Sequence, residues 1–257
     1  MRILSYNILN GGEGRADPLA EVIEAQRADI VALVEADNLD VVERIARRLR
    51  MDYVRAEGAG HLAALLSRWP IVESINHAAL RGRPQALLEA QVAEPGGDSW
   101  VIGVVHLHAR AFDADETVRE EELTEVLGAF ARQRDAGRPH LLCGDFNANS
   151  PIQRIDPEKC KPRTREAWAA NGGGVPRRVI QRLLDAGYVD VLHAVKGDAA
   201  ATAASFTTQY PGQRIDYVFT WGIDASRLRD AWIETDRLAK YASDHFPVGA
   251  EIGGSSD

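Results

Sequence analysis

The sequence predicts an α/β protein in which two mixed β-sheets pack together with helices outside them. Short β-like runs recur along the chain, and turn signals such as Trp69-Pro70 separate several of them. Helical segments are interspersed among these runs without a strict strand–helix–strand alternation. A doubly wound parallel sheet needs a crossover between its strands, so the hairpin-like pairs favour stacked mixed sheets instead.

The helices are expected where apolar residues recur at helical spacing. For the first helix, Asp17 is expected to be the N-cap and Pro18 to occupy the first helical position. The second helix has Val42, Ile45 and Leu49 on one face, with arginines outside it. We expect helices at 18–26, 39–49, 113–134 and 179–186.

The strands are expected in the apolar or β-like runs between these helices. The run Ile30 to Val34 is apolar throughout, as a strand buried on both faces would be. Ser150 to Pro176 holds proline, glycine and basic residues and is expected to be irregular. We expect strands at 1–7, 30–34, 53–56, 62–67, 71–77, 86–93, 100–106, 140–144, 214–220, 231–235 and 245–252.

Length and composition indicate one globular domain spanning residues 1–257. The chain is 45% hydrophobic and 26% charged, and its net charge of −8 argues against a surface that grips nucleic acid everywhere. The N-terminus resembles a first strand rather than a signal peptide, and no apolar run approaches the length of a membrane span. Cys143 is expected in the core and Cys160 at the surface, without a disulfide framework, so we expect a cytoplasmic protein.

Polar residues interrupt the apolar runs at the points where strands should end. A charged group beside a buried strand is costly unless it is paired or binds a metal, so one shared site is predicted at one rim of the sheets. Asp145 and Asn147 are expected to point the same way, and Gly144 to leave room for backbone or ligand. The interrupting residues are Asn7, Glu35, His106, His108, Asp145, Asn147, Asp216, Asp244 and His245.

These residue types favour one kind of chemistry. Glu35 and Asp244 supply hard oxygen ligands suited to Mg²⁺ or Mn²⁺. Aspartate and histidine together can perform acid–base work on water. Because no serine or cysteine lies in an obvious nucleophile motif, metal-assisted hydrolysis by water fits better than a covalent intermediate.

Taken in chain order, the polar residues and their neighbours form a set of short motifs. The motifs are Asn7, Glu35, His106, Gly144-Asp145-Phe146-Asn147, Arg214-Ile215-Asp216-Tyr217 and Ser243-Asp244-His245-Phe246-Pro247. This ordered set resembles the endonuclease/exonuclease/phosphatase superfamily, which includes DNase I-like nucleases, AP endonucleases, neutral sphingomyelinases and inositol polyphosphate 5-phosphatases. The resemblance implies a four-layer α/β sandwich and divalent-metal-dependent cleavage of a phosphoester.

The resemblance also implies roles for single residues. Glu35 resembles the principal metal ligand of the family, with Asn7 nearby and Asp244 as a further acidic residue near the metal. Asp145 resembles the residue that orients or deprotonates the attacking water. Asn147 would help to hold the phosphate and that water.

Further roles follow from the same resemblance. His245 resembles the histidine that contacts the scissile phosphate, and Asp216 its orienting carboxylate. His106 falls where the DNase I and sphingomyelinase branches carry a second histidine. His61 falls where DNase I carries a glutamate paired to that histidine, so this pairing would be altered here. Arg83 resembles a phosphate-contacting arginine. The substrate-binding candidates are Arg83, His61 and His108.

Each residue taken alone also has an ordinary structural interpretation. Asn7 could be a turn residue, Glu35 could cap the following helix, and Asp216 could be an edge-strand charge. Two alternatives to the metal-dependent phosphoesterase are a zinc hydrolase built on the His106/His108 pair and a catalytically inactive binding module on the same fold. Zinc prefers tetrahedral nitrogen and sulfur ligands, whereas carboxylates and amides dominate this set.

A basic segment follows Asn147 in this acidic chain and bears on the substrate. Its functional interpretation is a lip beside the site that holds extra phosphates or a nucleic-acid backbone. Its structural interpretation is a solvated loop and a charged helix face. The substrate is expected to be nucleic acid, cut by endo- or exonuclease action, or a phosphorylated small molecule or lipid, and the protein is expected to be a monomer. The basic residues are Arg154, Lys159, Lys161, Arg163, Arg165, Arg177, Arg178 and Arg182.

Overall fold

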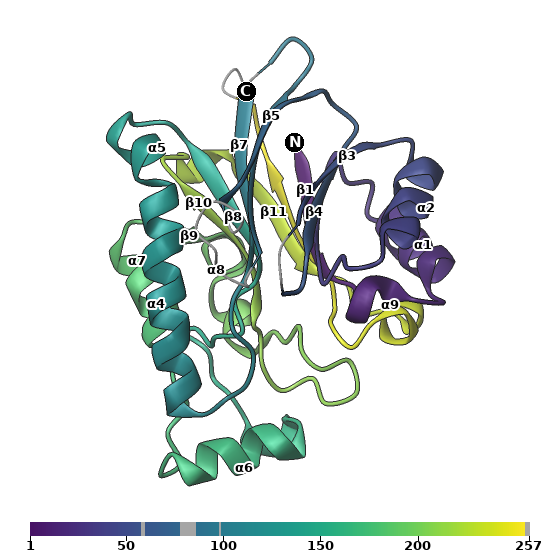
Figure 1. The fold of residues 1–257 in the computed structure, drawn as a ribbon. Helices are drawn as coiled ribbons and strands as arrows, with labels where there is room; N and C mark the ends of the chain where they lie inside the picture. Colours follow the sequence, from purple (N-terminus) through teal and green to yellow (C-terminus); the bar gives the residue numbers. More distant parts are fainter. Residues whose placement is uncertain (58–59, 78–85, 98, 255–257) are drawn as a thin grey trace.

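Apolar strands pair into two sheets that pack face to face. The computed structural model describes residues 1–57, 60–77, 86–97 and 99–254, and within them each sheet has six strands (Figure 1). The first sheet has the order β11-β12-β1-β2-β4-β3 and the second β5-β6-β7-β8-β10-β9. Strands β2 (Ile30–Val34) and β8 (His140–Asp145) are buried at every position, as expected for strands covered on both faces.

The other strands have the following bounds. In the first sheet they are β1 (Arg2–Asn7), β3 (Asp52–Ala56), β4 (Ala63–Ser67), β11 (Leu228–Ile233) and β12 (Val248–Ile252). In the second sheet they are β5 (Ile71–Asn76), β6 (Leu87–Ala93), β7 (Ser99–His106), β9 (Val189–Asp190) and β10 (Asp216–Trp221). The pairs β1–β2 and β7–β8 are parallel and the neighbouring pairs are antiparallel, so both sheets are mixed, as predicted.

Three hydrophobic layers hold the sheets and helices together. The inner layer joins the sheets through residues such as Ile30 and Leu141. A second layer joins the first sheet to α1 (Ala16–Ala25), α2 (Leu39–Leu49) and α9 (Arg237–Ala242). A third joins the second sheet to α4 (Asp113–Ala129) and α7 (Arg178–Asp185). The predicted arrangement of two mixed sheets between helices is therefore confirmed, in four layers (Figure 1).

The strand registers bring the predicted site residues to one rim. Asn7 pairs with Val34 at the ends of two parallel strands, which places Glu35 immediately beyond that pair. In the second sheet, Asp145 is aligned with His106 on one side and with Asp216 on the other. The two sheets thus contribute polar strand ends to the same edge, as the sequence predicts.

Several predicted boundaries were wrong for local reasons. Helix α1 begins at Ala16, so Asp17 lies in its first turn rather than at the N-cap, and Arg15 occupies the cap position without a side-chain hydrogen bond. The long helix ends at Ala129, and Phe130 separates it from α5 (Ala131–Asp135). Strand β12 begins only at Val248 because the preceding residues belong to the site loop.

The segment predicted to be irregular contains a helix, α6 (Pro162–Ala170), with proline in its first turn. Cys160, which was expected at the surface, is 1% exposed. It is covered by Gly212, where an added Cβ would lie 2.5 Å from the Cys160 Sγ. The sequence patterns did not predict α8 (Val191–Lys196), α9 or β9. No helix in the described part of the chain is long and apolar enough to cross a membrane.

Candidate active site

Asn7 connects the two sheets at the rim. Its side chain lies at the end of β1 and is 1% exposed. The Nδ2 group donates to Glu35 Oε1 at 3.0 Å and to Asp145 Oδ2 at 3.1 Å. The backbone N–H of Leu9 donates to the Oδ1 of Asn7 at 2.9 Å, which fixes the orientation of the amide. Asn7 therefore links Glu35, which follows a strand of the first sheet, to Asp145 on the second sheet, and it is not simply a turn residue.

Glu35 is positioned by the turn after β2. It has a positive φ of 54°, and its Oε2 accepts a 2.6 Å hydrogen bond from the backbone N–H of Asn10. It does not cap the next helix, because the side chain of Asn38 accepts from Val41 N there. Burial alone would raise the pKa of Glu35, but the hydrogen bonds from Asn10 and Asn7 lower it, so the carboxylate is ionised.

Asp145 lies at the centre of the site, 1% exposed at the end of β8. Its Oδ2 is 3.7 Å from the Nε2 of His245 and 3.8 Å from the Nε2 of His106. Burial, reinforced by the charge of Asp216, raises the pKa of Asp145 to about 7. A buried carboxyl that exchanges its proton near neutral pH is suited to general acid–base chemistry.

His245 and Asp216 form a buried pair beside Asp145. The Nδ1 of His245 is 2.9 Å from the Oδ2 of Asp216, and both residues are less than 5% exposed. Burial opposes the imidazolium charge, but Asp216 and Asp145 outweigh it and raise the pKa of His245 to about 10. The Nδ1–H therefore donates to Asp216, which leaves the Nε2–H directed at the side of Asp145 and able to donate to an anion.

Ser205 holds Asp216 in place. Its Oγ donates to the Oδ2 of Asp216 at 2.6 Å and accepts from the backbone N–H groups of Ile215 and Asp216 at 3.1 and 3.2 Å. The ring of the next residue, Phe206, lies 4.5 Å from the ring of His245. Sequence reasoning missed both residues because the segment 203–213 has no periodic pattern. A bridge between Phe206 and His245 brings it to the site.

Asn147 reaches the rim by a different route from the one predicted. It has a positive φ of 48° rather than an extended backbone, so it does not simply repeat the direction of Asp145. Its backbone N–H donates to Asp145 Oδ1 at 2.8 Å, and its Nδ2 donates to the carbonyl of Leu107 at 2.9 Å. Asparagine tolerates this left-handed conformation better than most residues, which accounts for its place after the strand.

Gly144 serves backbone packing rather than ligand access. It has a φ of +143°, and an added Cβ would lie 1.8 Å from the carbonyl oxygen of Val105 on β7. The glycine therefore permits the close approach of β7 and β8 that aligns His106 with Asp145.

His106 and His61 lie side by side at the edge of the site. Their ring centroids are 5.6 Å apart, and the Nδ1 of His61 is 2.7 Å from Asp37 Oδ2. Burial lowers the pKa of His106 to about 4, so its imidazole is neutral, and its buried Nδ1 has no hydrogen-bond partner in the described chain. The hydrogen bond that His61 donates to Asp37 raises the pKa of His61.

The donor set fits a divalent cation in two respects. Asp145, Asp216 and His245 form a buried cluster with one ligand atom from each within 4.8 Å of the others, which is compatible with a divalent metal. Glu35 and Asn7 offer oxygens at the same rim. Asp244 adds a buried Oδ1 that has no hydrogen-bond partner among the described residues and lies 4.0 Å from the Nε2 of His245. Unsatisfied carboxylate oxygens are expected where a cation binds.

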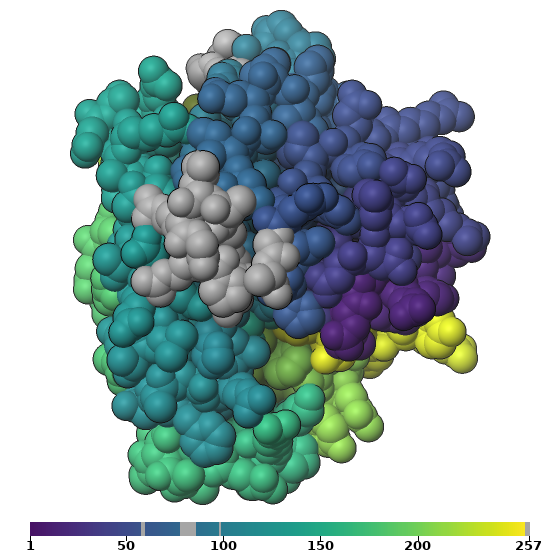
Figure 2. All heavy atoms as spheres, in the orientation of Figure 1, coloured from purple at the N-terminus to yellow at the C-terminus, as the bar shows by residue number. Residues whose placement is uncertain are grey.

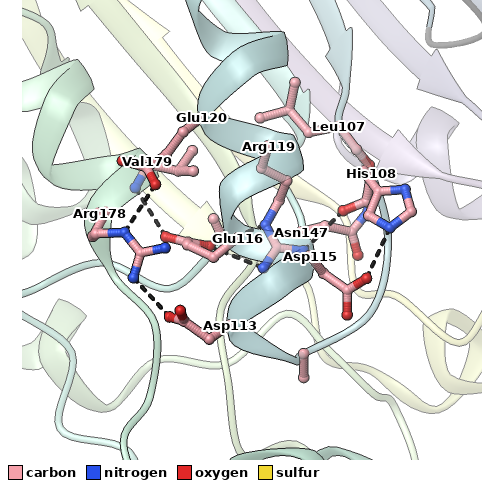
Figure 3. Close-up of polar contacts among 12 residues, drawn as sticks. Leu107, His108, Asp113, Asp115, Glu116, Arg119, Glu120, Asn147, Arg178 and Val179 are labelled. Atoms are coloured by element: carbon pink, nitrogen blue, oxygen red, sulfur yellow. Dashed lines mark hydrogen bonds and ion pairs between the residues drawn. The ribbon is translucent and has the colours of Figure 1, made fainter. Parts of the chain in front are cut away.

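His108 is not part of this cluster. Its Nε2 is 3.0 Å from Asp115 Oδ1 (Figure 3). Its backbone N–H donates to Glu122. In the described part of the chain, no metal-ligating group of three residues includes His106 or His108. The zinc alternative therefore lacks a third ligand there. Arg83 lies outside the described residues.

The basic segment divides into paired and unpaired cations. Arg178 bridges Asp113 and Glu120 at 2.7 and 2.8 Å, and Arg165 pairs with Glu158 at 2.6 Å (Figure 3 shows the first of these). The other basic residues of this segment that contact neighbours are Arg154, Lys159, Arg177 and Arg182. Within the described chain, Lys161 and Arg163 have no carboxylate partner, so only part of the segment fits the prediction of a basic lip.

Comparison with known proteins agrees with the fold. Two docked mixed sheets with this arrangement define the DNase I-like fold. The model of the Endonuclease/Exonuclease/phosphatase family matches residues 4–245, so the chain belongs to that family, whose members are hydrolases that act on phosphoester bonds. No curated protein sequence matches the chain.

Solved structures share the fold at low sequence identity. An AP endonuclease from Archaeoglobus fulgidus superposes with a TM-score of 0.76 at 19% identity, covering 98% of this chain and 99% of its own. The 3′ phosphatase NExo from Neisseria, bound to a product DNA hairpin, gives 0.72 at 22% identity, covering 98% and 99%. The human Nocturnin catalytic domain, with a bound sulfate anion, gives 0.71 at 17% identity, covering 99% and 94%.

Proposed function

We propose that this protein is a divalent-metal-dependent phosphoesterase that cleaves its substrate by attack of water. The observation that carries the proposal is the continuous hydrogen-bonded chain from the half-buried Glu35 through the buried Asn7 to the buried Asp145, with the His245–Asp216 pair beside it. Family membership supports hydrolysis of a phosphoester. The proposed substrates are nucleic acid or a phosphorylated small molecule, and the solved NExo complex with DNA supports the first.

The carboxylate and amide oxygens at the rim identify the residues that would hold the cation. Glu35, Asn7 and Asp244 would bind Mg²⁺ or Mn²⁺, because hard cations prefer oxygen ligands. When bound, the cation would supply positive charge that offsets the negative charge of the phosphate oxygens.

The remaining residues perform the proton transfer and charge stabilisation. Asp145 orients a water molecule and accepts its proton as the water oxygen attacks phosphorus. The ester P–O bond breaks on the opposite side, and the leaving oxygen takes a proton from solvent and departs as an alcohol. Asn7 and Asn147 hold the two oxygens of Asp145 from opposite sides at 3.1 and 2.8 Å, which fixes the direction of that carboxylate. His245 donates from Nε2 to the phosphate oxygens while its Nδ1–H donates to Asp216.

The proposal is tested with a panel of substrates in Mg²⁺, Mn²⁺ and chelator. The panel comprises plasmid DNA, abasic duplex, RNA, phosphoinositides, sphingomyelin and bis(p-nitrophenyl) phosphate. We expect turnover that chelation abolishes and Mg²⁺ restores with no zinc bound. Asp145→Asn should abolish that turnover, whereas Asp113→Asn, a surface aspartate paired with Arg178, should not.

Two outcomes would point elsewhere. Restoration by zinc alone would support a zinc hydrolase. A folded protein that cleaves no member of the panel, and whose binding of a partner is unchanged by Asp145→Asn, would support an inactive binding module.

A further inference from the structure

A pocket adjoins the candidate active site and has no part in the proposed mechanism. It has a volume of about 210 Å³. Asn147 and Phe206 line it, and both also border the site, since Asn147 holds Asp145 and the Phe206 ring contacts that of His245. Residues 109–112 and α6 supply much of the remaining wall, and α6 lies at the lower edge of the molecule in Figures 1 and 2.

The described wall of the pocket is basic in an acidic protein. No aspartate or glutamate lines it among the described residues, whereas four basic side chains do. Arg119 is neutralised by Glu116 at 2.9 Å. Arg110, Lys161 and Arg163 have no carboxylate partner in the part of the chain that the structure describes. Unpaired cations gathered around one cavity favour an anionic ligand.

Aromatic rings form the apolar part of the same pocket. Trp168 is 3% exposed in the wall, Phe112 is 42% exposed, and Phe206 lies under the ammonium group of Lys161 at 5.7 Å. An apolar cavity of about 150 Å³ is enough to hold benzene. A space of about 210 Å³ therefore admits one aromatic ring with its substituents.

Three polar atoms that belong to wall residues are buried and have no partner in the described chain. They are the Oδ1 of Asn149, the Oε1 of Gln213 and the Nε1 of Trp168, and each belongs to a residue less than 8% exposed. Buried polar groups are normally hydrogen-bonded, so two free acceptors and one free donor indicate a polar ligand. A heterocycle with N–H and ring-nitrogen groups on its edge can satisfy them.

We propose that this pocket binds the base and a flanking phosphate of an unpaired nucleotide next to the scissile phosphate. This inference rests on the proposed function of the site and names its substrate class as a single nucleic-acid strand or a smaller nucleotide. A sugar phosphate has no ring system that could stack on the aromatic side chains. A lipid chain would leave Arg110, Lys161 and Arg163 without an anion. Stacked, unpaired bases use aromatic and basic side chains in this combination.

Binding in the absence of metal tests the pocket independently of catalysis. Calorimetry with adenosine 5′-monophosphate, ribose 5-phosphate and inorganic phosphate compares ligands with and without a base. We expect adenosine monophosphate to bind about 10-fold more tightly than ribose 5-phosphate, because one stacked base contributes about that factor. Equal affinities would overturn the proposal.

Variants of exposed residues locate that binding without disturbing the core. Arg163→Gln removes a pocket cation, and Ala109→Trp fills the entrance. Each substitution should weaken the binding of adenosine monophosphate about 10-fold. Arg165→Gln is the matched control, because Arg165 lies on the same helix but pairs with Glu158 outside the pocket. A loss in Arg165→Gln equal to that in Arg163→Gln would count against a pocket-specific site.

Turnover separates the pocket from the proposed activity. A short DNA or RNA oligonucleotide is compared with the same sugar–phosphate chain lacking bases. We expect kcat/KM to be about 10-fold higher for the chain that carries bases. Ala109→Trp should remove this difference, whether the chain is DNA or RNA. If neither chain is cleaved while adenosine monophosphate binds as expected, the proposed function is wrong and the pocket stands. If both are cleaved equally, the function stands and the pocket assignment is wrong.

Discussion

Arg214 forms a two-point ion pair with Asp190 in the protein interior. The Nη1–Oδ1 and Nη2–Oδ2 distances are 2.9 and 2.6 Å, and both side chains are at most 2% exposed. The guanidinium also lies 4.5 Å from the ring of Tyr217. Because Arg214 is two residues before Asp216, this pair anchors the entry to β10 and with it the carboxylate that contacts His245.

Arg214→Met should therefore destabilise the protein strongly. The substitution leaves the carboxylate of Asp190 buried without its partner, so the free energy of unfolding should fall by about 3–5 kcal/mol. Urea denaturation measures the change. The double variant Asp190→Leu/Arg214→Met removes both charges and should be more stable than Arg214→Met alone. A loss below about 1 kcal/mol in the single variant would mean that the pair is not needed for folding.

His245→Gln should lower turnover without unfolding the chain. The variant cannot present a cationic Nε2–H to the phosphate, so kcat should fall about 10²- to 10⁴-fold. Circular dichroism and the urea midpoint serve as the folding controls. Asp216→Asn should lower kcat less, because it alters the position of the imidazole and not the group that contacts the phosphate. Near-normal kcat in His245→Gln would exclude the assigned role.

Gly144→Ala should cost far more stability than a glycine substitution elsewhere. Its Cβ would overlap the carbonyl of Val105 at 1.8 Å, so a loss of at least about 3 kcal/mol is expected. Gly137→Ala is the matched control, since Gly137 also has a positive φ, 64°, but open space around it. That variant should lose only about 1–2 kcal/mol to left-handed strain. Similar losses in the two variants would show that contact with β7 is unimportant.

The buried imidazole of His140 should lower the free energy of unfolding in mild acid. Burial lowers its pKa in the folded state below the unfolded value of 6.5, helped by the charge of Arg134 and opposed by the hydrogen bond to Arg138 O. Below pH 6.5 the unfolded chain therefore binds more protons than the folded one, and stability decreases as the pH falls. His140→Phe removes this contribution, so the stability of wild type relative to the variant should decrease from pH 7.5 to 5.5. A difference that stays constant with pH would contradict the assignment.

The sequence predicted that several candidate site residues lie together, because each of them follows an apolar strand whose position the local pattern determines. Asn7, Glu35, Asp145 and His106 follow apolar strands, and strand ends in register must meet at one edge. The apolar and β-like runs along the chain also predicted the two mixed sheets. The prediction failed for Asn147, whose left-handed backbone replaces the expected extended geometry.

Other features depend on contacts between distant segments and leave no local pattern. Ser205 reaches Asp216 through a loop that has no periodicity, and Cys160 is buried because Gly212 packs over it. Helix α6 lies within a run of basic and proline residues that reads as irregular. Tertiary contacts override composition in each case.

The hydrogen bond from Asn7 to Asp145 spans the seam between the sheets, so neither half of the molecule carries the proposed catalytic centre alone. A folding intermediate in which the two sheets have not yet packed together would contain the site residues of each sheet, but Asn7 would not be bonded to Asp145. Turnover would therefore require that the two sheets have packed together. During refolding, activity should return later than secondary structure.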